Sequence, residues 1–509
     1  MSEVPPEFKK VALVGTGAMG QGIAQISAQS GSQVYLFDHV SGAADKAKEA
    51  IKAQWSRLLQ KSKITEEQFN LYSARLITTE SLSELSAVEL VIEAITEELS
   101  AKQALFSKLE TAVGAECVLV SNTSSLSIAA IGARLKNPSR FAGYHFFNPV
   151  PLMKVVEVIK GIKTTPKTCE RLITYAAQMG HTPVSASDTP GFIVNHAGRG
   201  YITEALRICT ESICDFETID RVLKDQLGFK LGPFELMDLT ALDVSHRVME
   251  SIYHQYYQED RYRPAYITAQ RLAAGVLGKK VGAGFYNYEN NIQQTSAEPS
   301  PPAIDKLPPV WVSARAARRA SLLQMLKDFG ASIETAAAPS NDALCVVAPL
   351  GLDVTTVAIL ERLDPSRTIG IDLLIPDEST KRRVIATNPA TRDDMREIAH
   401  ALFARDGKSV SVIRDSGGFI TQRVIATIVN IACDICQQSI CTPEDLNAAV
   451  TLGLGYPAGP LQLGDQLGPN NILETLLNLQ SVYGDQRYRP SPWLRRRGAL
   501  GISLMQKEH

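Results

Sequence analysis

A strand, a glycine-rich turn and a helix follow one another near the start of the chain and predict a nucleotide-binding unit. Residues 11–14 are a short apolar run, typical of a buried strand. Gly15, Gly17 and Gly20 then follow with G-x-G-x-x-G spacing. These glycines allow a tight turn, the approach of backbone to a pyrophosphate, and close packing of helix on strand. The helix over 18–30 would direct its N-terminal amides at the phosphates.

The next strand, over residues 34–37, ends in Asp38, which lies 18 residues after Gly20. A carboxylate at this position accepts the hydroxyls of the adenine ribose. The same charge repels a 2′-phosphate, so the pattern favours NAD over NADP. An ordinary βαβ unit with a glycine-rich turn is the alternative, and the complete order of strand, glycines, helix, strand and acid disfavours it.

Length and composition limit the remaining possibilities. With 509 residues, the chain is long enough for three or four domains. Its net charge of −2 gives no general case for binding nucleic acid or an anionic membrane. Residues 1–10 are too polar for a signal peptide, and no apolar run has membrane-spanning length. We therefore expect a cytoplasmic protein. We expect no metal site, because Cys433-x-x-Cys436 lacks a second cysteine pair.

Polar residues at the ends of later strands are candidates for a catalytic site. The run 121–126 contains Ser124 and follows the apolar strand 117–120, where ligands bind in doubly wound sheets. His145 ends the strand that begins near Arg140, and Glu157 lies in the strand that follows. Antiparallel pairing of these strands would place Glu157 beside His145 and make the imidazole a better base. The alternatives are a helix cap and a buried core histidine.

The second half of the chain repeats the first with a shift of 227 residues. Leu227-Gly228-Phe229 matches Leu454-Gly455-Tyr456, and Asp188 matches Asp415. The candidate chemistry is not repeated, because the shift places Asp372 at the position of His145. We predict an α/β Rossmann-type domain, an all-α domain, and a degenerate second copy of both. The expected parts are 1–188 (NAD-binding), 189–290 (helical), 291–309 (linker), 310–414 (degenerate Rossmann-like) and 415–509 (second helical).

These motifs, in this order, resemble the 3-hydroxyacyl-CoA dehydrogenase family over residues 10–288. The motifs that carry the resemblance are the glycine turn 15–20, Glu93-Ala94-Ile95, Ser121-Asn122-Thr123-Ser124-Ser125, His145-Phe146-Phe147-Asn148-Pro149, Thr189-Pro190-Gly191-Phe192-Ile193-Val194-Asn195 and Gly282-Ala283-Gly284-Phe285-Tyr286. The duplicated organisation resembles the longer bacterial members, especially those acting on 3-hydroxyadipyl-CoA in phenylacetate degradation. The resemblance implies NAD-dependent oxidation of (3S)-3-hydroxyacyl-CoA to 3-oxoacyl-CoA.

The resemblance also implies roles for individual residues. His145 would be the general base for the substrate hydroxyl, Glu157 would orient it, and Ser124 and Asn195 would hold the substrate oxygen. The positions that match cofactor or coenzyme A contacts of the family are Glu97, Lys102, Asn148, Lys280 and Lys61. At Gln54 the family has a serine, so the chain departs from the family pattern at the coenzyme A contact near Lys61.

Arg199 lies one helical turn after Asn195, and we weigh it as a partner for a distal substrate carboxylate against a surface or interdomain arginine. A carboxylate-binding role would favour 3-hydroxyadipyl-CoA, and the main alternative is 3-hydroxybutyryl-CoA of fatty-acid or butanoate metabolism. A non-catalytic NAD-binding protein and a sugar- or hydroxyacid-acting relative are further alternatives. We also expect 189–290 to pack on 416–509 as an internal pseudo-dimer, with a homo-oligomer left open.

Overall fold

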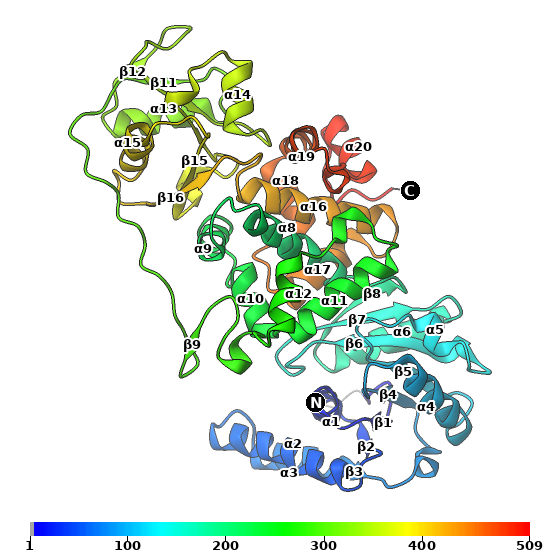
Figure 1. Ribbon diagram of the computed structural model, residues 1–509. Coiled ribbons are helices and arrows are strands. Elements are labelled where there is room, and N and C mark those ends of the chain that lie inside the picture. The colour runs from blue at the N-terminus through cyan, green and yellow to red at the C-terminus, as the bar shows by residue number, and fades with distance from the viewer. Residues whose placement is uncertain (1–4, 509) are drawn as a thin grey trace. The chain divides into compact units, whose positions relative to one another are not determined.

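The computed structural model describes residues 5–508 and divides the chain into two compact units (Figure 1). The first unit extends to His196 and also includes Gln438–Leu454, a short segment from late in the chain. The second unit comprises Ala197–Gln437 and the chain from Gly455 onward. The first unit therefore contains sequence from both halves of the chain.

An eight-stranded sheet forms the centre of the first unit. Its strands follow the order β3-β2-β1-β4-β5-β6-β7-β8, and all neighbours are parallel except β6 and β7. This is the predicted doubly wound arrangement with one antiparallel turn near its edge. The strands are β1 (Lys10–Val14), β2 (Gln33–Phe37), β3 (Leu76–Thr78), β4 (Leu90–Glu93), β5 (Val118–Ser121), β6 (Phe141–Phe146), β7 (Val155–Lys160) and β8 (Thr182–Ser187).

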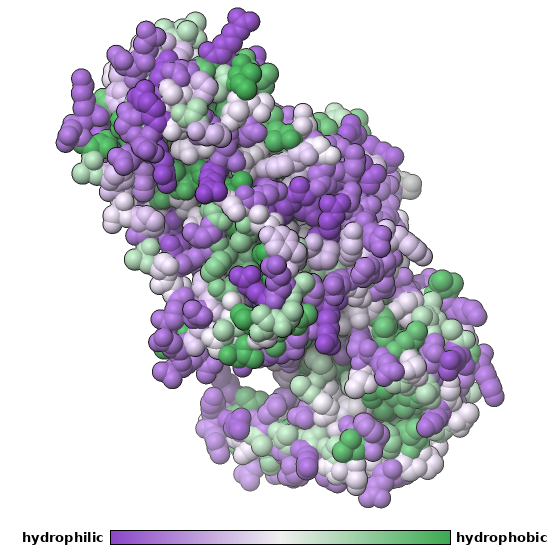
Figure 2. Space-filling view, in the orientation of Figure 1, coloured by the Kyte–Doolittle hydropathy of each residue, from purple (hydrophilic) through white to green (hydrophobic). Residues whose placement is uncertain are grey.

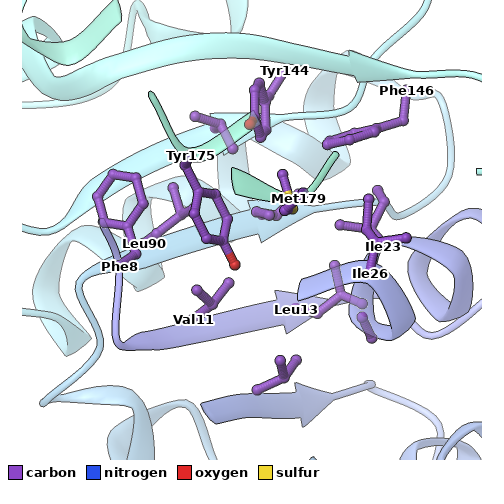
Figure 3. Close-up of a cluster of buried hydrophobic side chains, with 14 of the residues drawn as sticks. Phe8, Val11, Leu13, Ile23, Ile26, Leu90, Tyr144, Phe146, Tyr175 and Met179 are labelled. Carbon is purple, nitrogen blue, oxygen red and sulfur yellow. The ribbon is translucent and has the colours of Figure 1, made fainter. Parts of the chain in front are cut away.

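Helices cover this sheet because its central strands, β1 and β4 to β7, are buried on both faces, as in other parallel sheets. The helices of the unit are α1 (Ala18–Gln29), α2 (Ala43–Gln60), α3 (Glu66–Ala74), α4 (Leu99–Ala112), α5 (Ile128–Gly132), α6 (Pro166–Gln178), α7 (Val194–Ala197) and α17 (Pro443–Leu454). Figure 3 shows part of the core, where Leu13 of β1 lies near Ile26 of α1 and Val11 lies below the ring of Tyr175.

The second unit contains two sets of helices and a second sheet. Helix α8 (Arg199–Thr210) packs along α16 (Thr421–Gln437), and the two lie side by side in Figure 1. The other long helices are α9 (Phe216–Leu227), α10 (Pro233–Thr240), α11 (Leu242–Gln255), α12 (Tyr266–Ala273), α13 (Arg319–Asp328), α14 (Val354–Leu360), α15 (Asp393–Phe403), α18 (Pro460–Leu467), α19 (Pro469–Tyr483) and α20 (Pro492–Leu500).

The second sheet has six strands in the order β12-β11-β13-β14-β15-β16. Its last four strands pair parallel, antiparallel and parallel, as β5 to β8 do in the first sheet. The strands are β11 (Val310–Val312), β12 (Ile333–Glu334), β13 (Leu344–Val347), β14 (Thr368–Ile371), β15 (Arg382–Thr387) and β16 (Ser409–Arg414), and a separate hairpin is formed by β9 (Tyr288–Glu289) and β10 (Ile292–Gln293).

None of the helices within residues 5–508 is long and apolar enough to cross a membrane. On the face shown in Figure 2, hydrophobic residues occur in small groups among hydrophilic ones. Arg497, in the basic run Arg495–Arg497 of α20, is not solvated. Its guanidinium is buried over the ring of Trp493, 3.3 Å from the ring centroid, and donates to the Gln506 carbonyl.

Candidate functional site

The glycine-rich turn has the geometry that a dinucleotide needs. Gly15 has a φ of +96°, and a Cβ there would lie 2.6 Å from the Ala94 carbonyl oxygen. A Cβ on Gly20 would collide with the carbonyl oxygen of Gly15. At Gly17, by contrast, a Cβ would meet nothing within 4 Å, and this residue begins helix α1 without a side-chain cap. The open side of the turn therefore faces free helix amides and fits a pyrophosphate.

Asp38 lies at the end of β2 and anchors this turn. Its carboxylate accepts hydrogen bonds from the Thr16 amide and hydroxyl, both at 2.8 Å, and from the Val40 amide at 3.1 Å. Burial opposes ionisation, but the backbone and side-chain hydrogen bonds outweigh it and hold the pKa of Asp38 below its usual value. The side chain is therefore a carboxylate at neutral pH, as the predicted ribose contact requires.

A buried ionic cluster supports the turn that carries Ser124. The Lys102 ammonium group lies 2.6 Å from Glu93 and 3.4 Å from Glu97, and its side chain is 1% exposed. Glu97 in turn accepts the Ser124 amide at 2.8 Å and the Thr123 hydroxyl at 2.7 Å. Burial opposes ionisation of Glu97, but the Lys102 charge and these hydrogen bonds hold its pKa below the usual value. Glu97 and Lys102 thus fix the Ser124 turn, a role that the sequence did not reveal.

His145 and Glu157 form the central pair of the site. The two residues are direct partners in the antiparallel β6–β7 register, which confirms the predicted pairing. His145 Nδ1 lies 2.5 Å from Glu157 Oε2, and Glu157 is completely buried. A carboxylate accepts hydrogen bonds, so this contact places the proton on Nδ1 and leaves the lone pair on Nε2. The imidazole ring packs beside Phe147, with centroids 4.4 Å apart.

The other oxygen of Glu157 links this pair to Asn195. Glu157 Oε1 accepts the Ile193 and Val194 amides, both at 2.9 Å, just before Asn195 on α7. Asn195 Nδ2 donates to the Ser124 carbonyl at 3.3 Å. His145, Glu157, Asn195 and Ser124 therefore belong to one connected network. The amides of Ile193 and Val194 have no sequence signal, because a backbone donor is independent of residue type.

The remaining predicted residues do not join this network. Asn148 is exposed after β6, and Lys61 is exposed at the end of α2. Arg199 and Lys280 belong to the second unit. Arg199 is 6% exposed, and its burial lowers its pKa to about 10, so it is not a surface arginine. Lys280 forms an ion pair with Asp243 at 2.5 Å.

The network has the parts needed to take a proton from a substrate hydroxyl. Nε2 of His145 is the available base, and Glu157 stabilises the imidazolium that proton uptake produces. The Asn195 amide and the Ser124 hydroxyl are hydrogen-bonding groups on the same network. Around it, among residues 5–508, the structure shows no group of three or more side chains able to hold a metal ion.

Comparison with protein families identifies both types of domain. Residues 10–189 match the model of the 3-hydroxyacyl-CoA dehydrogenase NAD-binding domain. Residues 191–288 and 418–504 each match the C-terminal domain of the same enzymes. Together the matches cover more than half of the chain, and the cofactor of the glycine turn is NAD.

Comparison with individual proteins gives similarity over nearly the whole length. The chain is 34% identical over 492 residues to 3-hydroxyadipyl-CoA dehydrogenase of Escherichia coli, covering 96% of this chain and 97% of that protein. The crystal structure of a 3-hydroxybutyryl-CoA dehydrogenase from E. coli superposes with a TM-score of 0.86, at 34% identity, covering 97% of this chain and 99% of the other. A shorter (S)-3-hydroxybutyryl-CoA dehydrogenase from Ralstonia eutropha, 36% identical, matches 55% of this chain and 99% of its own, with a TM-score of 0.54.

Proposed function

Since the chain belongs to the 3-hydroxyacyl-CoA dehydrogenase family, we infer that it oxidises (3S)-3-hydroxyacyl-CoA to 3-oxoacyl-CoA with NAD. The observation that carries this inference is the buried His145–Glu157 pair, joined through α7 to Asn195. A protein that only bound NAD would have no need of an oriented imidazole base. The glycine turn and Asp38 supply the groups that hold the dinucleotide.

We propose that His145 Nε2 takes the proton of the 3-hydroxyl group. A secondary alcohol does not lose its proton in neutral water, and a positioned general base contributes about 10²–10⁴-fold to the rate. Ser124 and Asn195 donate hydrogen bonds to the substrate oxygen and stabilise the charge that develops there. Glu157 keeps the imidazole in the correct tautomer. NAD, when bound, supplies the hydride acceptor.

The remaining family contacts are also proposals. We assign Asn148 and Glu97 to the cofactor side of the site and Lys61 to coenzyme A. Lys61 is exposed at the end of α2, as a contact with a large polar ligand requires. Lys102 and Lys280 would contribute through the carboxylates that they hold, Glu93 and Asp243.

We propose 3-hydroxyadipyl-CoA, from phenylacetate or aromatic catabolism, as the preferred substrate. A dicarboxylyl substrate needs a cation for its distal carboxylate, and Arg199 is buried, where a guanidinium binds a carboxylate more strongly than at the surface. The near full-length similarity to 3-hydroxyadipyl-CoA dehydrogenase supports this choice. The competing substrate is 3-hydroxybutyryl-CoA, after which the similar enzymes from E. coli and R. eutropha are named.

The direct test follows NADH absorbance with purified protein, NAD and the two substrates in parallel. We expect turnover of both compounds, with a higher kcat/KM for the adipyl compound. Arg199→Ala should remove this preference and leave kcat/KM for the butyryl compound unchanged. A preference that survives Arg199→Ala contradicts the role of Arg199. Absence of turnover with NAD still bound contradicts the enzymatic function.

We further propose that the second half is a degenerate copy that pairs with the first inside one chain. The shared strand pairing of the two sheets and the second match to the C-terminal domain model support duplication. The packing of α8 on α16 supports an internal pseudo-dimer of the helical parts 189–290 and 415–509. In this arrangement 1–188 is the NAD-binding domain, 291–309 the linker and 310–414 the degenerate Rossmann-like domain. We also propose a cytoplasmic location, in keeping with eight cysteines that form no disulfide among residues 5–508.

A further inference from the structure

Helix α17 comes from the second half of the chain but packs on the NAD-binding sheet. It contacts β7, the strand of Glu157, and the edge strand β8, and Figure 1 shows it beside both strands. The segment before the helix is fastened to the end of β8, because the Ser187 amide donates to the Ile440 carbonyl at 2.9 Å. The segment Gln438–Leu454 is therefore an integral part of the first unit.

Helix α17 approaches the turn that binds Glu157 at Gly453. A Cβ on Gly453 would lie 3.1 and 3.2 Å from the two methyl carbons of Val194, and 3.5 Å from a methyl carbon of Val155. The Val194 amide is one of the two donors to Glu157 Oε1, and Asn195 follows it directly. A side chain at this position would therefore be in tight contact with Val194, which would have to move by a few tenths of an ångström.

The same contact occurs a second time in the duplicated half. The shift of 227 residues relates Gly453 to Gln226 of α9, Val194 to Thr421, and Val155 to Arg382. Gln226 is hydrogen-bonded to the Thr421 hydroxyl and donates to the Arg382 carbonyl at 3.2 Å. Each helical part thus contributes one helix that packs on the sheet of the other half, α17 on the first sheet and α9 on the second. The half with Asp372 and Gln422 in place of His145 and Asn195 has a bulky side chain at this contact.

We propose that α17 is a positioning element of the catalytic site and that Gly453 is its positioning residue. By packing against Val194, the helix holds the 193–195 turn against Glu157. It thereby positions both the carboxylate that orients His145 and the side-chain amide of Asn195. This assigns a role to the second half of the chain, which has no catalytic residues at the equivalent positions. The inference rests on the proposed function for its kinetic consequence, but not for its structural one.

The test compares Gly453→Val with Leu452→Phe, which adds volume to the neighbouring, exposed position of the same helix. Gly453→Val should displace Val194 and lower kcat by ~10–100-fold, since small misplacements at a reacting centre have effects of this order. The dissociation constant of NAD should change by less than about twofold, because the glycine turn is remote from α17 in the sheet order. Amide hydrogen exchange at residues 193–194 should become about tenfold faster. Adding Val194→Ala to Gly453→Val should recover most of the lost kcat, whereas Leu452→Phe should behave as the wild type.

The outcomes separate this inference from the proposed function. Unchanged exchange at 193–194 in Gly453→Val overturns the positioning role, whatever the activity. An equal loss of kcat in Leu452→Phe also overturns it, because the effect would then belong to the helix in general. If the wild type lacks turnover but Gly453→Val still accelerates exchange at 193–194, the positioning role stands and the proposed reaction fails.

Discussion

The two carboxylate oxygens of Glu157 accept hydrogen bonds from three donors, and Glu157→Gln distinguishes their roles. The glutamine oxygen can still accept the Ile193 and Val194 amides, so α7 should remain in place. The NH₂ group then faces His145 Nδ1 and must donate to it, which moves the ring proton to Nε2. His145 can then no longer act as a base, and we expect kcat to fall by about 10³–10⁴-fold with little change in the unfolding temperature.

The control for this prediction is Glu157→Ala, measured in the same kinetic and thermal unfolding experiments. Alanine leaves the buried Ile193 and Val194 amides without their acceptor, at a cost of ~1–3 kcal/mol each. We therefore expect Glu157→Ala to lose both kcat and stability, whereas Glu157→Gln loses kcat alone. Equal losses of stability in the two variants would show that the glutamine does not preserve the turn.

Asp372 lies at the position that His145 occupies in the first half. It is a buried carboxyl group, and its ionisation should lower the stability of the folded protein in a pH-dependent way. One oxygen accepts from Gln422 at 2.9 Å, while the other has no hydrogen-bond partner within the described residues. Burial raises the pKa of Asp372 to about 6. The protonated form is favoured in the folded state, so stability should fall as pH rises from about 4 through about 6 and stay low above it.

Asp372→Asn should remove this cost, since the amide resembles the neutral acid. A pKa difference of about two units corresponds to ~3 kcal/mol. We expect the variant to match the wild type in unfolding free energy near pH 4 and to exceed it by ~2–3 kcal/mol at pH 7.5. Thermal unfolding of both proteins across this pH range tests the sign. A constant difference at all pH values would contradict the titration of Asp372.

At the scale of elements, the sequence predicts the first sheet and the His145–Glu157 register well. Periodicity identifies the strands, and an antiparallel turn between neighbouring strands fixes which residues face each other. It does not predict the Glu93–Lys102–Glu97 cluster, because nothing local shows that a lysine on α4 is buried. It also misses α17 on the NAD-binding sheet, since a contact between residues more than 250 positions apart leaves no periodic signal.

Asp188 and Asp415 occupy equivalent positions after the last strand of each sheet, and each accepts hydrogen bonds from the start of one helix in its half. Asp188 accepts from the Ile128 and Ala129 amides and the Ser127 hydroxyl at the start of α5. Asp415 does the same for the amides of Val354 and Thr355 at the start of α14. We expect Asp188→Ala to lower the unfolding free energy by about 1–2 kcal/mol, as the loss of a capping carboxylate does.

Thermal unfolding of Asp188→Ala and Asp188→Asn measures this effect. Asparagine keeps one acceptor oxygen, so the Asp188→Asn variant should lose less stability than Asp188→Ala. If the two variants are equally stable, the carboxylate does not act through these hydrogen bonds.

At the scale of the whole molecule, the two helical parts contact each other reciprocally. Arg261 donates to the Arg489 carbonyl at 2.6 Å, and Arg487 donates to the Arg263 carbonyl at 3.5 Å. These residues belong to the repeated Arg-Tyr-Arg-Pro motif, so the same pair of positions meets twice across the contact. Reciprocity of this kind is the rule in two-fold dimers of identical subunits.

This reciprocity predicts how a fragment ending at residue 295 should behave. In the full chain, the buried Glu204 of α8 binds Arg423 and Arg487, which both come from the second half. The fragment leaves Glu204 without these partners and exposes the apolar side chains of α8, including Ile202 and Leu206. A large apolar face exposed to water is unfavourable.

We therefore expect the 1–295 fragment to associate into dimers through α8, and to be less stable than the full chain when dilute. Light scattering over a range of concentrations measures the association, and NADH absorbance measures the activity of each sample. Because the fragment also lacks α17, its kcat should fall below that of the full chain even when it is dimeric. A fragment that remains monomeric, stable and fully active would contradict both the internal pairing and the role of α17. The full chain is the matched control, since it contains the same catalytic residues with both contacts in place.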